Sequence, residues 1–156
     1  MNTVMRYAPS LAAVLFLVTP AHAELGGRPT WNAGSASSTA APTARPGAIS
    51  PPPYTVNQTT LPSGTVVREY VASGGAVFAV VWSGAQMAPL NTLLGPYFQD
   101  YLQGLSVSQA AHGGYGPVVV EQPHLVVQSG GHMGAFTGRA YLPQAFPPGI
   151  VPDDAR

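Results

Sequence analysis

One stretch of the chain, Tyr54–Trp82, constrains the fold more than any other because it carries three β-strand patterns separated by two tight turns. Valine, threonine and aromatic residues dominate it, and these side chains favour strands. The breaks fall at Leu61–Gly64 and Ser73–Gly75, where proline, serine and glycine favour turns. The third strand, Ala76–Trp82, is apolar at every position, so we expect it to be covered on both faces and to lie inside the sheet.

The segment Ala88–Leu105, which follows this meander, has the spacing of an amphipathic helix. Pro96 lacks an N–H and crowds the preceding turn, so Gly95-Pro96 predicts a kink or two short helices that share one apolar face. Gly104 predicts the end of the helix, and the residues Ser106–Pro117 predict a loop. The apolar face consists of Leu90, Leu93, Leu94, Tyr97, Phe98, Tyr101, Leu102 and Leu105.

The remaining strand patterns lie in the last third of the chain. Val118–Glu121 is a short strand candidate. Leu125–Ser129 and His132–Leu142 predict a β-hairpin that turns at Gly130-Gly131, because two glycines suit a two-residue turn. We therefore predict an α+β fold: a single antiparallel β-sheet of about five or six strands, made of the meander, a short strand and a C-terminal hairpin, with one kinked amphipathic helix packed on one face.

The first 23 residues have the pattern of a secretory signal peptide. Arg6 supplies the positive start, Leu11–Val18 is an apolar run too short to span a bilayer, and Ala21-His22-Ala23 is a small-residue cleavage site. The pattern predicts an exported protein, periplasmic or secreted, whose signal peptide is cleaved. Because the chain has no cysteine, packing without disulfides must hold the exported fold.

Composition divides the rest of the chain into three parts. Residues 24–53 are rich in Gly, Ala, Ser, Thr and Pro and predict a flexible arm, in which Trp31 is a candidate anchor. Residues 54–143 hold the single α+β domain. Residues 144–156 form a Pro-rich tail that we expect to be extended and frayed.

Charged residues are scarce, at 8% of the chain, and six basic residues balance six acidic ones. A formally neutral chain offers no basic face for phosphates, so we do not expect nucleic-acid binding. No apolar run after the signal peptide approaches a membrane-spanning length, so we expect no membrane span in the mature chain.

The three histidines of the mature chain, His112, His124 and His132, do not have metal-site spacing. With the hairpin turning at Gly130-Gly131, His124 and His132 lie roughly 16 Å apart along the strand, too far to share an ion. No cysteine or paired-histidine motif assists. The Gly-rich pairs lack the lysine and helix of a phosphate loop. We expect neither a metal site nor a cofactor.

Catalytic patterns are weak as well. Ser129 and His132 flank the predicted turn without a nucleophile-elbow pattern, so a role in turn geometry is favoured over a nucleophile and its base. Glu69 lies in the middle strand of the meander, and a pairing of Glu69 with Arg139 across the sheet is one hypothesis; such a pair would be a structural ion pair before it was a catalytic one. A small hydrolase-like enzyme would need Ser129, His132, Glu69 and Arg139 in one pocket.

Several motifs together make the chain similar to the bacterial domain-of-unknown-function family 2844. The motifs are Leu61–Tyr70, the strand Val77–Trp82, Leu93-Leu94-Gly95 with Tyr97-Phe98, and Ser129–Met133 leading to Gly138–Tyr141. The resemblance covers roughly Leu25–Ile150, and it implies a small exported proteobacterial protein without an assigned activity, cofactor or catalytic residue. Two positions depart from the family pattern: Gly134 stands where a basic residue is expected, and Pro96 stands where a helix-compatible residue is expected.

We predict a non-catalytic binding or adaptor module of the cell envelope, which recognises another envelope protein or a cell-surface polymer. The hydrolase-like enzyme is the first alternative, and a structural component that self-assembles through an uncovered sheet edge is the second. The candidate binding residues lie on the hairpin and the middle strand: His132, Met133, Phe136, Arg139, Tyr141 and Glu69.

Overall fold

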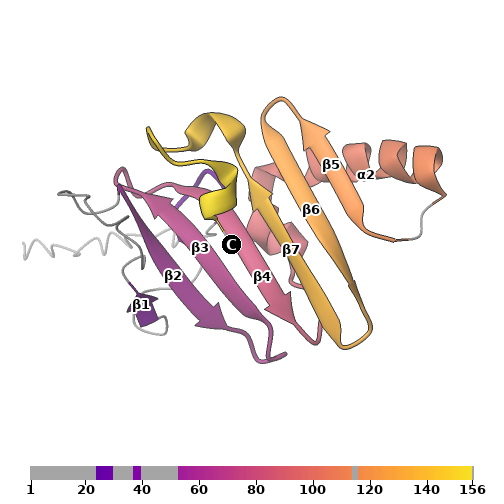
Figure 1. The fold of residues 1–156 in the computed structure, drawn as a ribbon, viewed down its shortest axis with the longest axis horizontal. Helices are drawn as coiled ribbons and strands as arrows, with labels where there is room; N and C mark the ends of the chain where they lie inside the picture. Colours follow the sequence, from indigo (N-terminus) through magenta and orange to yellow (C-terminus); the bar gives the residue numbers. More distant parts are fainter. Residues whose placement is uncertain (1–23, 30–36, 40–52, 114–115, 156) are drawn as a thin grey trace, which may run out of the picture.

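The computed structural model describes residues 24–29, 37–39, 53–113 and 116–155. Seven strands form one antiparallel sheet in the order β1-β2-β3-β4-β7-β6-β5 (Figure 1). The predicted α+β fold is therefore confirmed: the six strands expected from the sequence are β2 to β7, and the short β1 pairs with β2. The strands are β1 (Ser37–Thr39), β2 (Tyr54–Thr60), β3 (Val66–Ala72), β4 (Val77–Gly84), β5 (Val118–Gln122), β6 (Leu125–His132) and β7 (Ala135–Tyr141).

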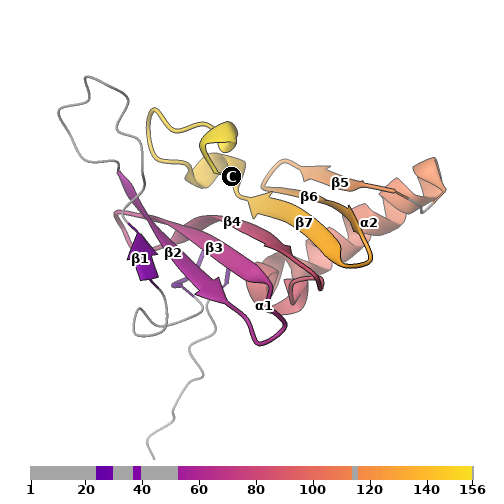
Figure 2. The ribbon, with the colours of Figure 1, turned by 60° about the horizontal axis from the view of Figure 1, so that its bottom comes forward.

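The apolar strand β4 lies inside the sheet, between β3 and β7, as its sequence predicts. Its alternate side chains enter two separate cores, because successive residues of a strand point to opposite faces. Val80 and Trp82 belong to the larger core, on the face covered by the helices. Ala79 belongs to the smaller core on the other face, which the C-terminal segment covers (Figure 2). Phe78 joins Ala79 in this core because the register against β3 shifts at Phe78, where a bulge breaks the alternation.

The helix is interrupted where the sequence predicts it, but it ends later. It consists of α1 (Leu90–Leu94), a 3-10 turn (Gly95–Tyr97) and α2 (Phe98–His112). The predicted end at Gly104 and the predicted loop from residue 106 are wrong, because α2 continues to a left-handed cap at Gly113. Gly104 instead serves packing: a Cβ there would overlap the side chain of Val120 in β5, so its glycine lets helix and strand approach closely.

The hairpin also turns at a different dipeptide from the one predicted. In β6 and β7, His132 opposes Ala135, so the turn is Met133-Gly134, and Gly130 and Gly131 lie within β6. Gly134 has a φ of 88°, a conformation that glycine adopts without strain. Both dipeptides can turn locally, and the observed register pairs Gly138 with Ser129 of β6 on one side and with Trp82 of β4 on the other.

The first described segment, residues 24–29, is docked on the helix side of the sheet. Leu25 is 1% exposed and belongs to the larger core. The Leu25 N–H donates to the carbonyl of Leu93, the Gly26 N–H donates to that of Val77, and the Val77 N–H donates to that of Gly27. These residues fall in the segment predicted as a flexible arm, and they are part of the folded core. The predicted signal peptide and Trp31 lie outside the described residues.

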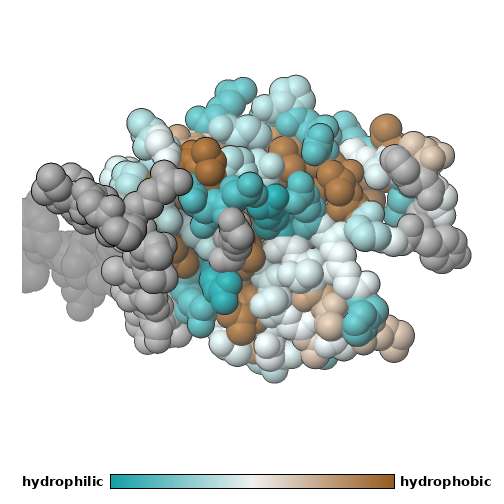
Figure 3. All heavy atoms as spheres, in the orientation of Figure 1, coloured by the Kyte–Doolittle hydropathy of each residue, from teal (hydrophilic) through white to brown (hydrophobic). Residues whose placement is uncertain are grey.

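The C-terminal segment packs on the face opposite the helices instead of fraying. The ring of Phe146 lies 5.0 Å from that of Phe78 and 5.6 Å from that of Tyr141, centroid to centroid. Ala155, almost at the end of the chain, is 1% exposed. In the space-filling view of this face, hydrophilic and hydrophobic residues alternate without forming one large apolar patch (Figure 3).

Burial of Tyr101 in the larger core makes stability depend on alkaline pH. Burial raises the pKa of the Tyr101 hydroxyl above its ordinary value of 10.0. Stability from the neutral hydroxyl is therefore fully present below the unfolded-state pKa and is lost as the pH rises through the folded-state pKa. We expect the free energy of unfolding to fall less in Tyr101→Phe than in the wild type when the pH rises from 8 to 11. Urea unfolding at each pH measures this free energy. Parallel losses in both proteins would contradict this prediction.

Candidate functional site

The candidate binding residues predicted from the sequence do not share one surface. His132 and Met133 are exposed near and in the β6–β7 turn, and Met133 is 92% exposed. Arg139 donates from Nε to Gln128 Oε1 at 2.8 Å and from Nη1 to the carbonyl of Pro152 at 3.2 Å. The guanidinium of Arg139 therefore already donates a hydrogen bond to the C-terminal segment. Phe146 of the same segment packs against the ring of Tyr141. Phe136, opposite Gly84 and Gly131, is partly buried.

Glu69 and Arg139 lie on opposite faces of the sheet, so the hypothesis of an ion pair between them is wrong. Glu69 opposes Val80 and Arg139 opposes Val81, and consecutive residues of β4 point to opposite sides. Glu69 is 2% exposed, on the helix side. Arg139 forms its ion pair with Asp153, with Nη1 3.4 Å from Oδ1.

The pocket needed by the hydrolase alternative is not assembled from these residues. Ser129 and His132 are three residues apart in β6 and therefore point to opposite faces. The Ser129 hydroxyl lies 4.0 Å from the sulfur of Met87, and the His132 ring contacts the carbonyl of Met133 at 3.0 Å. Glu69 shares the face of Ser129, whereas Arg139 lies on the other.

A pair that sequence reasoning missed joins α2 to the β5–β6 turn. His124 Nε2 lies 2.9 Å from Asp100 Oδ2, and the His124 ring lies 6.0 Å from that of Tyr97. Gln122 donates from Nε2 to the carbonyl of Asp100 at 2.8 Å. The sequence places Asp100 on the polar side of the helix, and only the packing of α2 against β5 shows what that side meets. The side chains of His124 and Asp100 are both more than a third exposed, so their interaction is a surface ion pair or hydrogen bond that contributes little to the free energy of unfolding.

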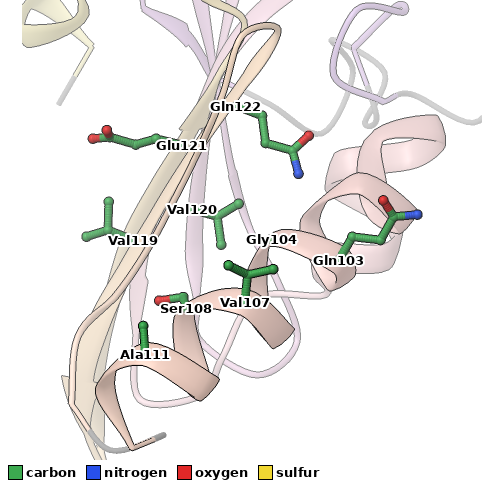
Figure 4. A pocket seen from close by; sticks show the side chains of 9 residues that line it. All are labelled: Gln103, Gly104, Val107, Ser108, Ala111, Val119, Val120, Glu121 and Gln122. Atoms are coloured by element: carbon green, nitrogen blue, oxygen red, sulfur yellow. The ribbon is translucent and has the colours of Figure 1, made fainter.

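An open groove runs between α2 and the outer edge of β5, with a volume of ≈ 470 Å³ (Figure 4). Val120 and Gln122 point toward the helix, whereas Val119 and Glu121 point to the other side of the strand. On the helix side the groove retains exposed apolar side chains, since Val107 is 71% exposed and Ala111 is exposed as well. Val119, 46% exposed, lies on the other side of the strand. Its lining residues are Gln103, Gly104, Val107, Ser108, Ala111, Val119, Val120, Glu121 and Gln122.

The sequence did not predict this groove, because half of the helix that lines it was predicted as a loop. Residues 106–112 were predicted as loop, so the apolar and small side chains of the second half of α2 had no place in the predicted architecture. Ala110, Ala111 and the absence of proline between Tyr97 and Pro117 were the available helix signals. The neighbouring strand β5 was predicted, but its position at the sheet edge depends on strand order.

Within residues 24–29, 37–39, 53–113 and 116–155, no three His, Cys, Asp or Glu side chains gather as metal ligands would. None of the helices in these ranges is long and apolar enough to cross a bilayer.

Comparison with known proteins identifies one family. The family model described as "Protein of unknown function (DUF2844)" matches residues 21–155. No curated protein and no solved structure matches the chain significantly.

Proposed function

Because the chain belongs to the DUF2844 family, whose description names no activity, we propose its function from its own surface: it is a non-catalytic binding module of the cell envelope that holds a protein partner in the groove between α2 and β5. The proposal includes export through a cleavable signal peptide, to the periplasm or the medium. Leu25, the second residue after the proposed cleavage site, packs in the core, so cleavage after Ala23 would leave the docked segment intact.

The observation that carries the proposal is the combination of an apolar groove with a sheet edge. Val107 is the most exposed apolar residue of the groove, and Val120 of the edge strand points toward the helix that carries it. Exposed apolar side chains that line a concavity are typical of a protein-binding surface. The lining carries a single titratable side chain, Glu121, whereas acid–base catalysis with two carboxylates needs a pair.

The β6–β7 hairpin, which the sequence predicted as the binding surface, is the alternative to the groove. Met133 is more exposed than Val107, but it stands at a turn, and Arg139 and Tyr141 of the same hairpin contact the C-terminal segment. The hairpin therefore offers one exposed apolar side chain at a turn, whereas the groove offers Val107 and Ala111 beside a concavity. This difference favours the groove.

Three matched substitutions test the proposal. Val107→Arg places a charge in the groove, Met133→Arg places it at the hairpin turn, and Val151→Arg places it on the C-terminal segment, where Val151 is 55% exposed. All three sites are exposed, so the variants are expected to fold, which circular dichroism checks. We expect cross-linking from intact cells to give one specific adduct with the wild type, and Val107→Arg to reduce it at least tenfold, because burying an unpaired charge in an interface costs more than about 1.4 kcal/mol.

The control variants decide between surfaces. Met133→Arg and Val151→Arg are expected to retain the adduct. Loss of the adduct in Met133→Arg alone would place binding at the hairpin and overturn the groove as the site. Absence of any adduct with the wild type would overturn the binding proposal itself and favour the enzyme or self-assembly alternatives.

A further inference from the structure

The outer edge of β5 is the edge of the sheet that borders the groove. In the described part of the chain, β5 pairs with β6 and has no strand on its other side. Such an edge presents a row of backbone N–H and C=O groups that can pair with a further extended segment. The strand is five residues long, from Val118 to Gln122, and prolines flank it at 117 and 123.

Helix α2 extends past this edge. In both ribbon views, its C-terminal half continues beyond β5, the last strand of the sheet (Figures 1 and 2). The same half supplies Val107, Ser108 and Ala111 to the groove. An extended segment placed beside β5 would therefore have its backbone against the strand and its alternate side chains against small and apolar residues of the helix.

Charge and shape favour a partner segment over a second copy of the chain. Glu121 is the charged residue of the edge strand beside the groove, with its side chain on the face away from α2, and the described ion pairs, Asp100–His124 and Arg139–Asp153, do not include it. A basic side chain beside Glu121 would complement it. A second copy pairing β5 with β5 would instead bring another Glu121, and its own α2 would extend into the space that the first α2 covers.

We propose that the groove binds an extended segment of a partner protein by strand addition to β5, with apolar side chains at alternate positions facing α2 and a basic side chain beside Glu121. This inference rests on the proposed function, because it specifies what the groove holds. In an antiparallel pairing, the basic residue of the partner lies opposite Glu121. The partner residue opposite Val119 is two positions further along and lies on the same face as the basic residue. The residues opposite Val118 and Val120 face the helix.

A peptide built to this pattern is the probe: acetyl-Ser-Thr-Arg-Val-Thr-Val-Ser-amide. Its arginine is placed opposite Glu121, and its two valines are placed opposite Val120 and Val118. Titration into the isotope-labelled chain from Glu24 is expected to shift the backbone amide resonances of β5 and of the second half of α2, around Val107 and Ala111. Shifts confined to other strands, or no shift at any soluble peptide concentration, would overturn the inference.

Backbone methylation separates strand addition from side-chain docking. In a strand, alternate N–H groups point to the same neighbour, so methylating alternate peptide nitrogens blocks either all of the hydrogen bonds to β5 or none of them. We expect one alternate set to weaken binding at least about tenfold and the other set to change it less than about threefold. Equal effects of the two sets would overturn strand addition and leave the groove as a binding site.

A charge exchange tests the proposed specificity. Glu121→Arg is expected to weaken binding of the arginine peptide at least about fivefold and to restore binding to the peptide that carries glutamate in its place. Val107→Arg should abolish both. If intact cells give a groove-dependent adduct but neither peptide responds to the exchange, the segment chemistry proposed here is wrong while the binding function stands. Dimerisation that requires β5, detected by sedimentation of the free chain, would show that a second copy is the occupant and overturn the inference.

Discussion

Replacing Leu25 with alanine is expected to lower the free energy of unfolding by about 2–5 kcal/mol, which is a large share of the stability of a small domain. Leu25 is 1% exposed and lies in the larger core with Leu93 and Leu94. Truncation leaves a cavity, because the backbone around Leu25 is held by hydrogen bonds to Leu93 and Val77 and cannot collapse into the space.

Leu102→Ala is the matched control for this prediction. It removes the same atoms from a leucine that is 40% exposed on α2, so we expect a loss of less than about 1 kcal/mol. Chemical denaturation of the chain from Glu24 measures both variants. Equal losses in the two variants would show that residues 24–29 are not part of the cooperative core.

Substituting alanine for Gly138 is expected to cost about 1–3 kcal/mol or more, because its Cβ would overlap the ring of Trp82. The same Cβ would lie 2.6 Å from the carbonyl oxygen of Gln128 in β6. Trp82 is fully buried, and β4 pairs it directly with Gly138 of β7. The largest side chain of the core therefore lies over a position where the neighbouring strand has none.

A double-mutant cycle identifies the cause of this loss. Trp82→Phe shortens the ring and also removes a buried indole N–H that has no hydrogen-bond partner among the described residues. We expect Gly138→Ala to cost less in the Trp82→Phe background, with a coupling energy of about 0.5–3 kcal/mol. Gly74→Ala, where nothing lies within 4 Å of the added Cβ, is the control and should change stability by less than about 0.5 kcal/mol. Strict additivity of the two core substitutions would contradict the packing argument.

The elements of the fold follow closely from local sequence patterns. The alternation of β2 and β3, the unbroken apolar run of β4 and the three-and-four spacing of the helix each depend on residues close together in the chain. The interruption at Gly95-Pro96 is equally local, because proline removes a hydrogen-bond donor wherever it stands in a helix. Glycine signals were less informative, since Gly104 and Gly130-Gly131 indicate the ends of elements locally but lie inside them in the structure.

The candidate site depends on contacts between residues far apart in sequence. Asp100 meets His124 across 24 positions, and the groove joins α2 to a strand that follows it in the chain. Predicting either requires the order of the strands and the position at which α2 crosses the sheet. Neither quantity is encoded in the periodicity of a single segment.

Side-chain spacing within single segments predicted strands β2 to β7, the first part of the helix with its interruption, and the burial of β4 on both faces, because this spacing is a property of each segment alone. It did not predict the second half of α2. Three features became visible only in the folded chain: Met133-Gly134 forms the turn, Glu69 and Arg139 point to opposite faces, and α2 continues past the edge of β5. The physical reason is that register and strand order are set by packing summed over the whole core, here by the fit of Trp82 against Gly138 and of Val120 against Gly104.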